Sequence, residues 1–185
     1  MIYPVTIIGH PTLRKRAEEV DQNYPDLEKI IDNMFETMYE SDGVGLAAPQ
    51  INKSIRIIVI DGAPMAEDDP DLKDFKKVLI NPEMVDEWGE EKLFNEGCLS
   101  IPNIREDVNR PSEIKLKYYD RDFNLKEEEF KGTQARIIQH EYDHLEGILF
   151  TDRISPLRKK ILKSKLLGLS KGKFKVSYRT LLGKK

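Results

Sequence analysis

Residues 139–144, with the sequence QHEYDH, contain two of the three histidines of this 185-residue chain. His140 and His144 are four positions apart, so a helix would place both imidazoles on one face, one turn from each other. Two imidazoles so spaced bind a single divalent metal, and Glu141 could aim its carboxylate at a water on that metal. The alternative is a solvated helix face whose histidine spacing is accidental. The pattern is H-E-x-x-H, which is typical of metal-dependent hydrolases.

A third ligand has to come from elsewhere, and the candidate is Cys98, the only cysteine. It follows a glycine between two candidate strands. A thiolate is a soft ligand that binds transition metals strongly. A lone cysteine is more often buried and inert, but the histidine pair favours a ligand here. Glu96, two positions earlier, could fix a nearby arginine, for which Arg105 and Arg110 are the candidates.

Residues 43–50, with the sequence GVGLAAPQ, predict one wall of a peptide groove. The glycines at 43 and 45 permit close approach of another backbone. Gln50 offers a neutral amide donor for a carbonyl oxygen that becomes negative. A phosphate-binding loop is the alternative, but the segment lacks the glycine patterns of such loops.

Hydrophobic periodicity predicts an α+β fold, with antiparallel strands packed around the central H-E-x-x-H helix. The predicted strands are residues 5–8, 55–60, 78–82 continued toward 88, 91–95, 113–119 and 125–130. The predicted helices are an amphipathic N-terminal one over 25–41, the metal-binding one over 134–145 with Thr133 as N-cap, and a basic one from Pro156 to about Leu167. Residues 62–77 predict an exposed acidic loop.

Charge is distributed unevenly along the chain. The chain has 30 Lys/Arg and 33 Asp/Glu residues. Residues 154–185 contain 11 basic residues and no acidic ones, so residues 1–153 contain 19 basic and 33 acidic residues, a net charge of −14. The length suits a single domain, predicted as residues 1–167, followed by a basic tail over 168–185. The tail predicts either a polyanionic partner or a solubilising end.

The chain is predicted to be cytoplasmic. No apolar run approaches the roughly 18 residues needed to span a membrane. The first residues lack the basic and apolar segments of a secretory signal. A single cysteine excludes an internal disulfide and fits a reducing compartment.

Three motifs together resemble the peptide deformylases, the bacterial metalloenzymes that remove the N-formyl group from new polypeptides. That family is marked by G-x-G-x-A-A-x-Q, E-G-C-x-S and Q-H-E-x-D-H. These stand here, in the same order, as GVGLAAPQ at 43–50, EGCLS at 96–100 and QHEYDH at 139–144. The resemblance covers about residues 1 to 167.

The resemblance implies metal ligands at Cys98, His140 and His144, with water in the fourth position. Glu141 is expected to act as general base on the metal-bound water that attacks the formyl carbon, and then as general acid toward the amine. The Gln50 side chain and the Leu99 backbone N–H are expected to hold the oxyanion. The products are formate and the deformylated peptide.

The resemblance also implies how an N-formylmethionyl peptide binds. Its backbone is expected to pair with extended segments around Val44 and Gly45 and after Cys98. Gly97 and Arg105 are further expected contacts, and an apolar pocket should take the methionine side chain. Arg136 stands where the family usually has an apolar pocket residue, so either its alkyl stem lines the pocket or the specificity differs.

The metal and the partners follow less directly. The resemblance suggests one Fe²⁺ per chain, with Zn²⁺, Ni²⁺ or Co²⁺ as substitutes. The basic segment 156–185 suggests docking on the ribosome, and neither DNA nor a membrane is expected as a partner. One rival is a zinc peptidase, which would need Glu146 or Asp152 as third ligand. Another is a metal-free binding module anchored to RNA by the basic tail.

Overall fold

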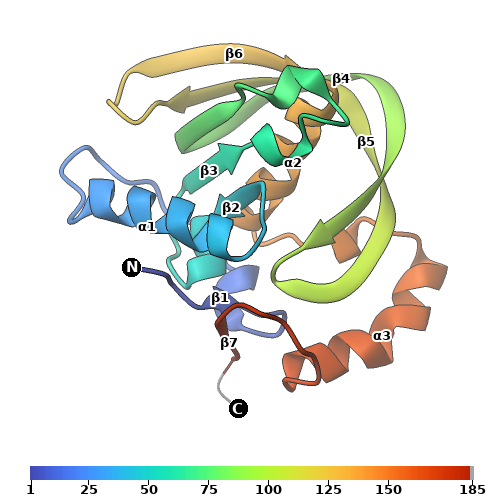
Figure 1. Ribbon diagram of the computed structural model, residues 1–185. Helices are drawn as coiled ribbons and strands as arrows, with labels where there is room; N and C mark the ends of the chain where they lie inside the picture. The colour runs from blue at the N-terminus through green and yellow to red at the C-terminus, as the bar shows by residue number, and fades with distance from the viewer. Residues whose placement is uncertain (184–185) are drawn as a thin grey trace.

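The computed structural model describes residues 1–183 (Figure 1). A five-stranded antiparallel sheet in the order β2-β3-β4-β5-β6 forms the centre. The strands are β2 Gly45–Ala47, β3 Ile57–Asp61, β4 Lys76–Cys98, β5 Ile101–Tyr119 and β6 Leu125–Lys131. The α-helices are α1 Leu27–Glu40, α2 Gly132–Leu145 and α3 Pro156–Ser170. The predicted α+β class is confirmed.

Strand β3 lies between two helices, which explains its unbroken apolar sequence. Ile57 and Val59 pack into the core cluster that contains the apolar face of α1. Ile58 and Ile60 point to the other side and pack into the cluster that contains α2. Because successive side chains of a strand alternate between its faces, a strand covered on both faces must be apolar throughout.

Helices α1 and α2 begin at different residues from those predicted. Helix α1 starts at Leu27, because Asp26 has a left-handed backbone with φ 58°. Helix α2 starts at Gly132 with Lys131 at the N-cap position, so Thr133 lies inside the first turn and the predicted cap is wrong. Within residues 1–183, no helix is long and apolar enough to cross a membrane.

Strands β4 and β5 form one long hairpin. The sequence predicted two shorter strands, 78–82 continued toward 88 and 91–95, where the structure has the single strand β4. They have 23 and 19 residues and join through a two-residue turn, with Cys98 paired to Ile101. Register shifts interrupt the pairing in four places, and Gly89 has φ 86°. Such irregularities bend and twist a ribbon, and the β4–β5 hairpin is curved (Figure 1). Cys98, at the end of β4, lies with its Sγ 3.3 Å from the Nε2 of His144 on α2.

Residues 62–77 are not simply an exposed acidic loop. Two short 3₁₀ turns, Ala63–Met65 and Pro70–Leu72, fold the segment against the body. Leu72 is fully buried and Phe75 nearly so, and both belong to the same core cluster as α2. Apolar side chains within the acidic segment therefore anchor it, while its carboxylates face water.

The C-terminal residues run back to the N-terminus. Ser155 caps α3 by accepting a hydrogen bond from the Arg158 N–H (3.3 Å), and the helix continues to Ser170, three residues past the predicted end. Strand β7, Thr180–Leu181, then pairs in parallel with β1, Val5–Thr6 (Figure 1). The division into a catalytic domain over 1–167 and a tail over 168–185 stays a prediction.

Candidate metal centre and substrate groove

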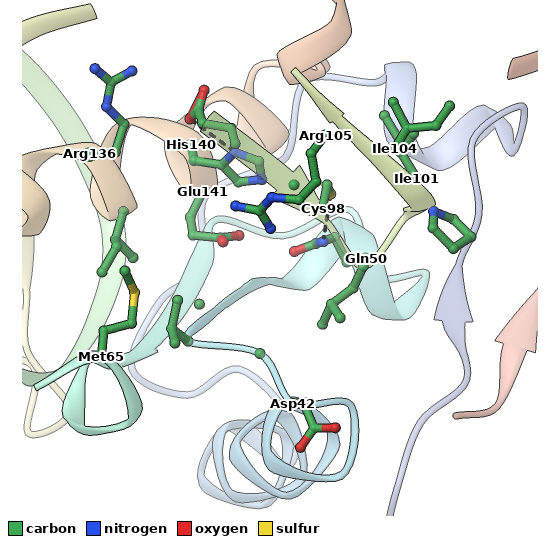
Figure 2. Close-up of a pocket in the computed structure, with 18 of the residues that line it drawn as sticks. Asp42, Gln50, Met65, Cys98, Ile101, Ile104, Arg105, Arg136, His140 and Glu141 are labelled. Carbon is green, nitrogen blue, oxygen red and sulfur yellow. Dashed lines mark hydrogen bonds and ion pairs between the residues drawn. The ribbon is translucent and has the colours of Figure 1, made fainter. Parts of the chain in front are cut away.

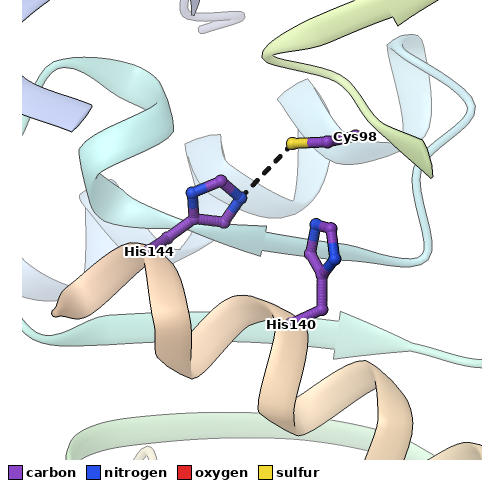
Figure 3. Close-up of side chains that lie close together, drawn as sticks. All are labelled: Cys98, His140 and His144. Carbon is purple, nitrogen blue, oxygen red and sulfur yellow. Dashed lines mark hydrogen bonds between the residues drawn. The ribbon is translucent and has the colours of Figure 1, made fainter. Parts of the chain in front are cut away.

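Cys98, His140 and His144 lie together (Figure 3). The two histidines are one turn apart on α2, and Cys98 ends β4 opposite them. One ligand atom from each residue lies within 4.8 Å of the other two, and the Cys98 Sγ is 3.3 Å from the His144 Nε2. A four-coordinate metal with bonds of about 2.0–2.3 Å needs donors grouped on this scale. One thiolate and two imidazoles fit a transition metal rather than Mg²⁺ or Ca²⁺.

The rival third ligands are engaged elsewhere. Glu146 pairs with Arg56 at 2.7 Å and with Arg16 at 3.1 Å. Asp152 pairs with Arg14 and accepts a hydrogen bond from the Leu149 N–H (2.8 Å). Neither carboxylate joins the histidine pair, which removes the structural basis for the zinc-peptidase alternative.

A chain of buried charges supports His140. Its Nδ1 lies 3.3 Å from Glu96 Oε1, and Glu96 accepts hydrogen bonds from Arg110 Nε at 3.1 and 3.2 Å. Arg110 also donates to Asp143 (2.8 Å), which in turn pairs with Arg153. With Nδ1 engaged by a carboxylate, the His140 Nε2 is left to face the centre.

Burial and neighbouring charges shift the two histidines in opposite directions. Burial opposes the charged form of His140, but hydrogen bonds with Cys98 and Glu96 raise its pKa well above the usual value. Burial, together with the charge of His140, lowers the pKa of His144 well below the usual value. A histidine that stays neutral is in the form that binds a metal.

Glu141 lies beside the centre with its carboxylate against Gly45. A Cβ at Gly45 would come within 2.6 Å of the Glu141 Oε1, so any larger residue there displaces the Glu141 side chain. Glu141 is only 5% exposed, and this burial raises its pKa to about 7. A carboxyl group that titrates near neutral pH suits both accepting and releasing a proton.

Gln50 and the 98–101 turn complete the other side of the centre. The Ala47 N–H donates to Gln50 Oε1 (2.8 Å), so the amide NH₂ is turned toward Cys98 Sγ (3.5 Å) and Ser100 Oγ (3.3 Å). Leu99 follows Cys98 directly in the turn. Gln50 is almost fully buried, and its orientation is set by the backbone of its own segment.

A cavity of about 590 Å³ opens over these groups (Figure 2). Gln50, Leu99, His140 and Glu141 line it. All five residues predicted to contact substrate also line it: Val44, Gly45, Gly97, Arg105 and Arg136. The sequence therefore predicted groups that the fold brings to one cavity.

The two cavity arginines are positioned differently. Arg136 is buried on α2, and its guanidinium donates to the carbonyls of Val108 (3.0 Å) and Lys92 (2.6 Å), away from Glu141 (Figure 2). With the guanidinium bound to these two carbonyls, the alkyl stem is the part of Arg136 left to line the cavity. Arg105 is exposed, lies over Gly97 and donates to Asn95 Oδ1 (2.9 Å); Arg110, not Arg105, pairs with Glu96.

The sequence did not indicate every residue that lines the cavity. Met65 reaches the cavity from the acidic segment, and Val176 and Tyr178 reach it from the C-terminal segment. The signal for the last two was the alternation of apolar or aromatic residues with polar ones over residues 173–179, which include Phe174, Val176 and Tyr178. That signal does not say which surface they contact.

A model of the polypeptide deformylase family matches residues 2–160. The chain belongs to this family. Polypeptide deformylases remove the N-formyl group from newly made polypeptides, so the chain is a hydrolase of N-terminal protein processing.

Individual deformylases agree over nearly the whole length. The chain is 50% identical to the peptide deformylase of Christiangramia forsetii, covering 97% of this chain and 95% of the relative. It is 42% identical to that of Salinibacter ruber, over 96% of this chain and 93% of the relative. The crystal structure of the Legionella pneumophila peptide deformylase matches with a TM-score of 0.80 and 38% identity, over 92% of this chain and 96% of the other.

Proposed function

We propose that this deformylase cleaves the formyl–nitrogen bond of N-formylmethionyl peptides at the cluster of Cys98, His140 and His144, releasing formate. The observation that carries the proposal is the grouping of these three donors within 4.8 Å of one another, beside the buried carboxylate of Glu141. Thiolate, imidazole and carboxylate meet in one cavity large enough for a peptide end.

Cys98, His140 and His144 would hold one divalent metal ion. When bound, it supplies a Lewis acid that lowers the pKa of a coordinated water toward neutrality. We propose Fe²⁺ as the native metal, with Zn²⁺, Ni²⁺ or Co²⁺ as substitutes, because a mixed sulfur and nitrogen donor set accepts each of these. Metal analysis of protein purified without oxygen tests the assignment; zinc alone, with full activity, would contradict it.

Glu141 is the proposed general base and general acid. Its burial and its pKa of about 7 favour taking a proton from the attacking water and returning it to the departing amine. The Gln50 NH₂ and the Leu99 N–H are the proposed donors to the oxygen that becomes negative. Support for Gln50 comes from its fixed amide orientation, since its oxygen is occupied by the Ala47 N–H.

The peptide is proposed to lie along Val44 and Gly45 on one side and Gly97 on the other. Gly45 lies in β2, which is an outer strand of the sheet and pairs with β3 along one edge. The other edge of an outer strand can pair with an extended peptide. The stem of Arg136 and nearby apolar side chains would contact the methionine side chain. Arg105, at the exposed rim, is the proposed contact for the peptide beyond the methionine.

Two substitutions separate the roles of base and ligand. Glu141→Gln should keep the metal and lose at least about 10²-fold in turnover, the usual size of a general-base effect. Cys98→Ala should lose metal affinity as well as activity. Formate release from a formyl-Met peptide and metal content are measured on the same samples. Full activity of either variant would contradict the mechanism.

We further propose that the enzyme works in the cytoplasm and docks on the ribosome through its basic C-terminal segment. Lys159, Lys160 and Lys163 are exposed on α3 and lie in the part of the chain that lacks acidic residues. Ribosomal RNA is the polyanion expected there. Replacing all three with Glu should abolish salt-sensitive co-sedimentation with ribosomes, whereas Lys29→Glu on α1 should not. Equal co-sedimentation of both variants would contradict docking through α3.

A further inference from the structure

Residues 171–183 fold back over the body and reach the substrate groove. The Val5 N–H donates to the Arg179 carbonyl (2.8 Å) and the Ile7 N–H to the Leu181 carbonyl (2.9 Å). Phe174 packs against the core cluster that holds the inner face of α3. This segment follows the residues 2–160 that the family model matches. The chain therefore builds part of its groove from residues beyond those of the family pattern.

Tyr178 lies at the point where this segment meets the active-site turn. Its hydroxyl donates to the Leu99 carbonyl oxygen at 2.8 Å, and both residues line the cavity. Burial, and to a smaller extent the charge of the nearby Cys98, raises the pKa of Tyr178 to about 12. The hydroxyl thus keeps its proton at neutral pH and remains a hydrogen-bond donor.

The turn that Tyr178 contacts does not have the backbone geometry of the favoured hairpin turns. The favoured two-residue hairpin turns require positive φ at their first central residue, or at both. Among residues 1–183 six non-glycine residues have positive φ, and neither Leu99 nor Ser100 is one of them. A turn of another type matches the strand twist less well, so contacts from outside help to fix the orientation of its peptide groups.

Contacts from four other residues surround the turn. The Ile8 N–H donates to the Ser100 carbonyl (2.9 Å), and Gln50 donates to the Ser100 hydroxyl (3.3 Å). Gly43 leaves room for the Leu99 side chain, because a Cβ at Gly43 would come within 3.0 Å of it. The Tyr178 hydroxyl is the contact that holds the carbonyl of Leu99 itself.

We propose that Tyr178 is a positioning residue for the deformylation reaction. By holding the Leu99 carbonyl it fixes the backbone at Leu99, and with it the direction of the Leu99 N–H toward the reacting formyl oxygen. The inference rests on the proposed role of that N–H as an oxyanion donor. Such a donor acts mainly on the transition state, so its displacement lowers kcat more than it raises KM.

Tyr178→Phe tests the proposal, because it removes the hydroxyl and keeps the ring that lines the groove. Tyr3→Phe is the matched control: the Tyr3 hydroxyl accepts a hydrogen bond from Asn33 (3.3 Å) on α1. Formate release from a formyl-Met peptide, metal content and the melting temperature are measured for both variants and the unaltered chain. We expect Tyr178→Phe to lower kcat about tenfold with little change in KM, since complete loss of an oxyanion donor costs about 10²–10³-fold.

The two proposals fail in different ways. Metal content and melting temperature of Tyr178→Phe should match those of Tyr3→Phe, and only its kcat should fall. A kcat equal to that of the unaltered chain would overturn the positioning role, as would a fall in kcat that follows metal loss or unfolding. Failure of the unaltered, metal-loaded chain to release formate would instead overturn the proposed function.

Discussion

Gly45→Ala is expected to disable the enzyme although it replaces no catalytic side chain. The added Cβ would come within 2.6 Å of Glu141 Oε1, 2.9 Å of its Cγ and 3.0 Å of its Cδ, whereas ordinary contact begins at 3.4 Å. The carboxylate therefore has to move by about 0.8 Å. Misplacing a catalytic group by about 1 Å costs on the order of 10²-fold in rate. That factor corresponds to about 2.7 kcal/mol of transition-state stabilisation.

The assay is steady-state formate release from a formyl-Met peptide, with metal content and melting temperature measured in parallel. The three atoms nearest to the new methyl group all belong to Glu141 and none to a proposed metal ligand, so the metal should be retained. Gly168→Ala is the matched control. Gly168 lies in helix α3, and a Cβ there would have its nearest neighbours, in the Lys173 side chain, at 3.8 Å. Within a helix, alanine is more stable than glycine by roughly 0.5–1 kcal/mol.

The expected result is a fall of about 10²-fold in kcat for Gly45→Ala and unchanged turnover for Gly168→Ala. A kcat of Gly45→Ala within threefold of the unaltered chain, with metal bound, would refute the reasoning. It would mean either that Glu141 moves without loss of function or that it is not the base.

Three further substitutions test the supporting structure. Arg110→Leu should destabilise the fold by about 3–5 kcal/mol in urea unfolding, because Glu96 is left as a buried charge without its cation. Ser155→Ala should cost about 1 kcal/mol, seen as a lower melting temperature, because α3 loses its N-cap. Arg136→Leu should cost about 1–3 kcal/mol by leaving two carbonyls without their donor, yet keep the KM for a formyl-Met peptide, since the guanidinium faces away from the cavity. A raised KM for this variant would show that the guanidinium contacts the substrate.

Local patterns predicted the local structure. The spacing of apolar residues gave helix α1 to within two residues at its start, because one buried face is enough to define a helix. The β-branched run at 55–60 predicted β3, since a strand buried on both faces needs such a run. The chemistry of a lone cysteine beside an H-E-x-x-H motif favoured Cys98 as the third ligand, and the resemblance to the peptide deformylases implied it, although Cys98 is 42 residues from His140 in sequence.

Long-range features were not predictable in the same way. The β4–β5 hairpin looked like several strands because its register shifts break the alternation of apolar and polar residues. The parallel pairing of β7 with β1 joins residues at opposite ends of the chain, and no local pattern encodes it. Two side-chain positions depend on backbone carbonyls that are distant in sequence. The Arg136 guanidinium donates to the Val108 carbonyl, and the Tyr178 hydroxyl donates to the Leu99 carbonyl.

The central claim is that one divalent metal, held by Cys98, His140 and His144, is required for removal of the formyl group. The most direct test is formate release from a formyl-Met peptide by protein prepared without oxygen, before and after removal of its metal by a chelator. The account predicts one metal per chain, loss of formate release with the metal, and recovery on adding Fe²⁺. Formate release that persists at full rate in the metal-free protein would contradict it.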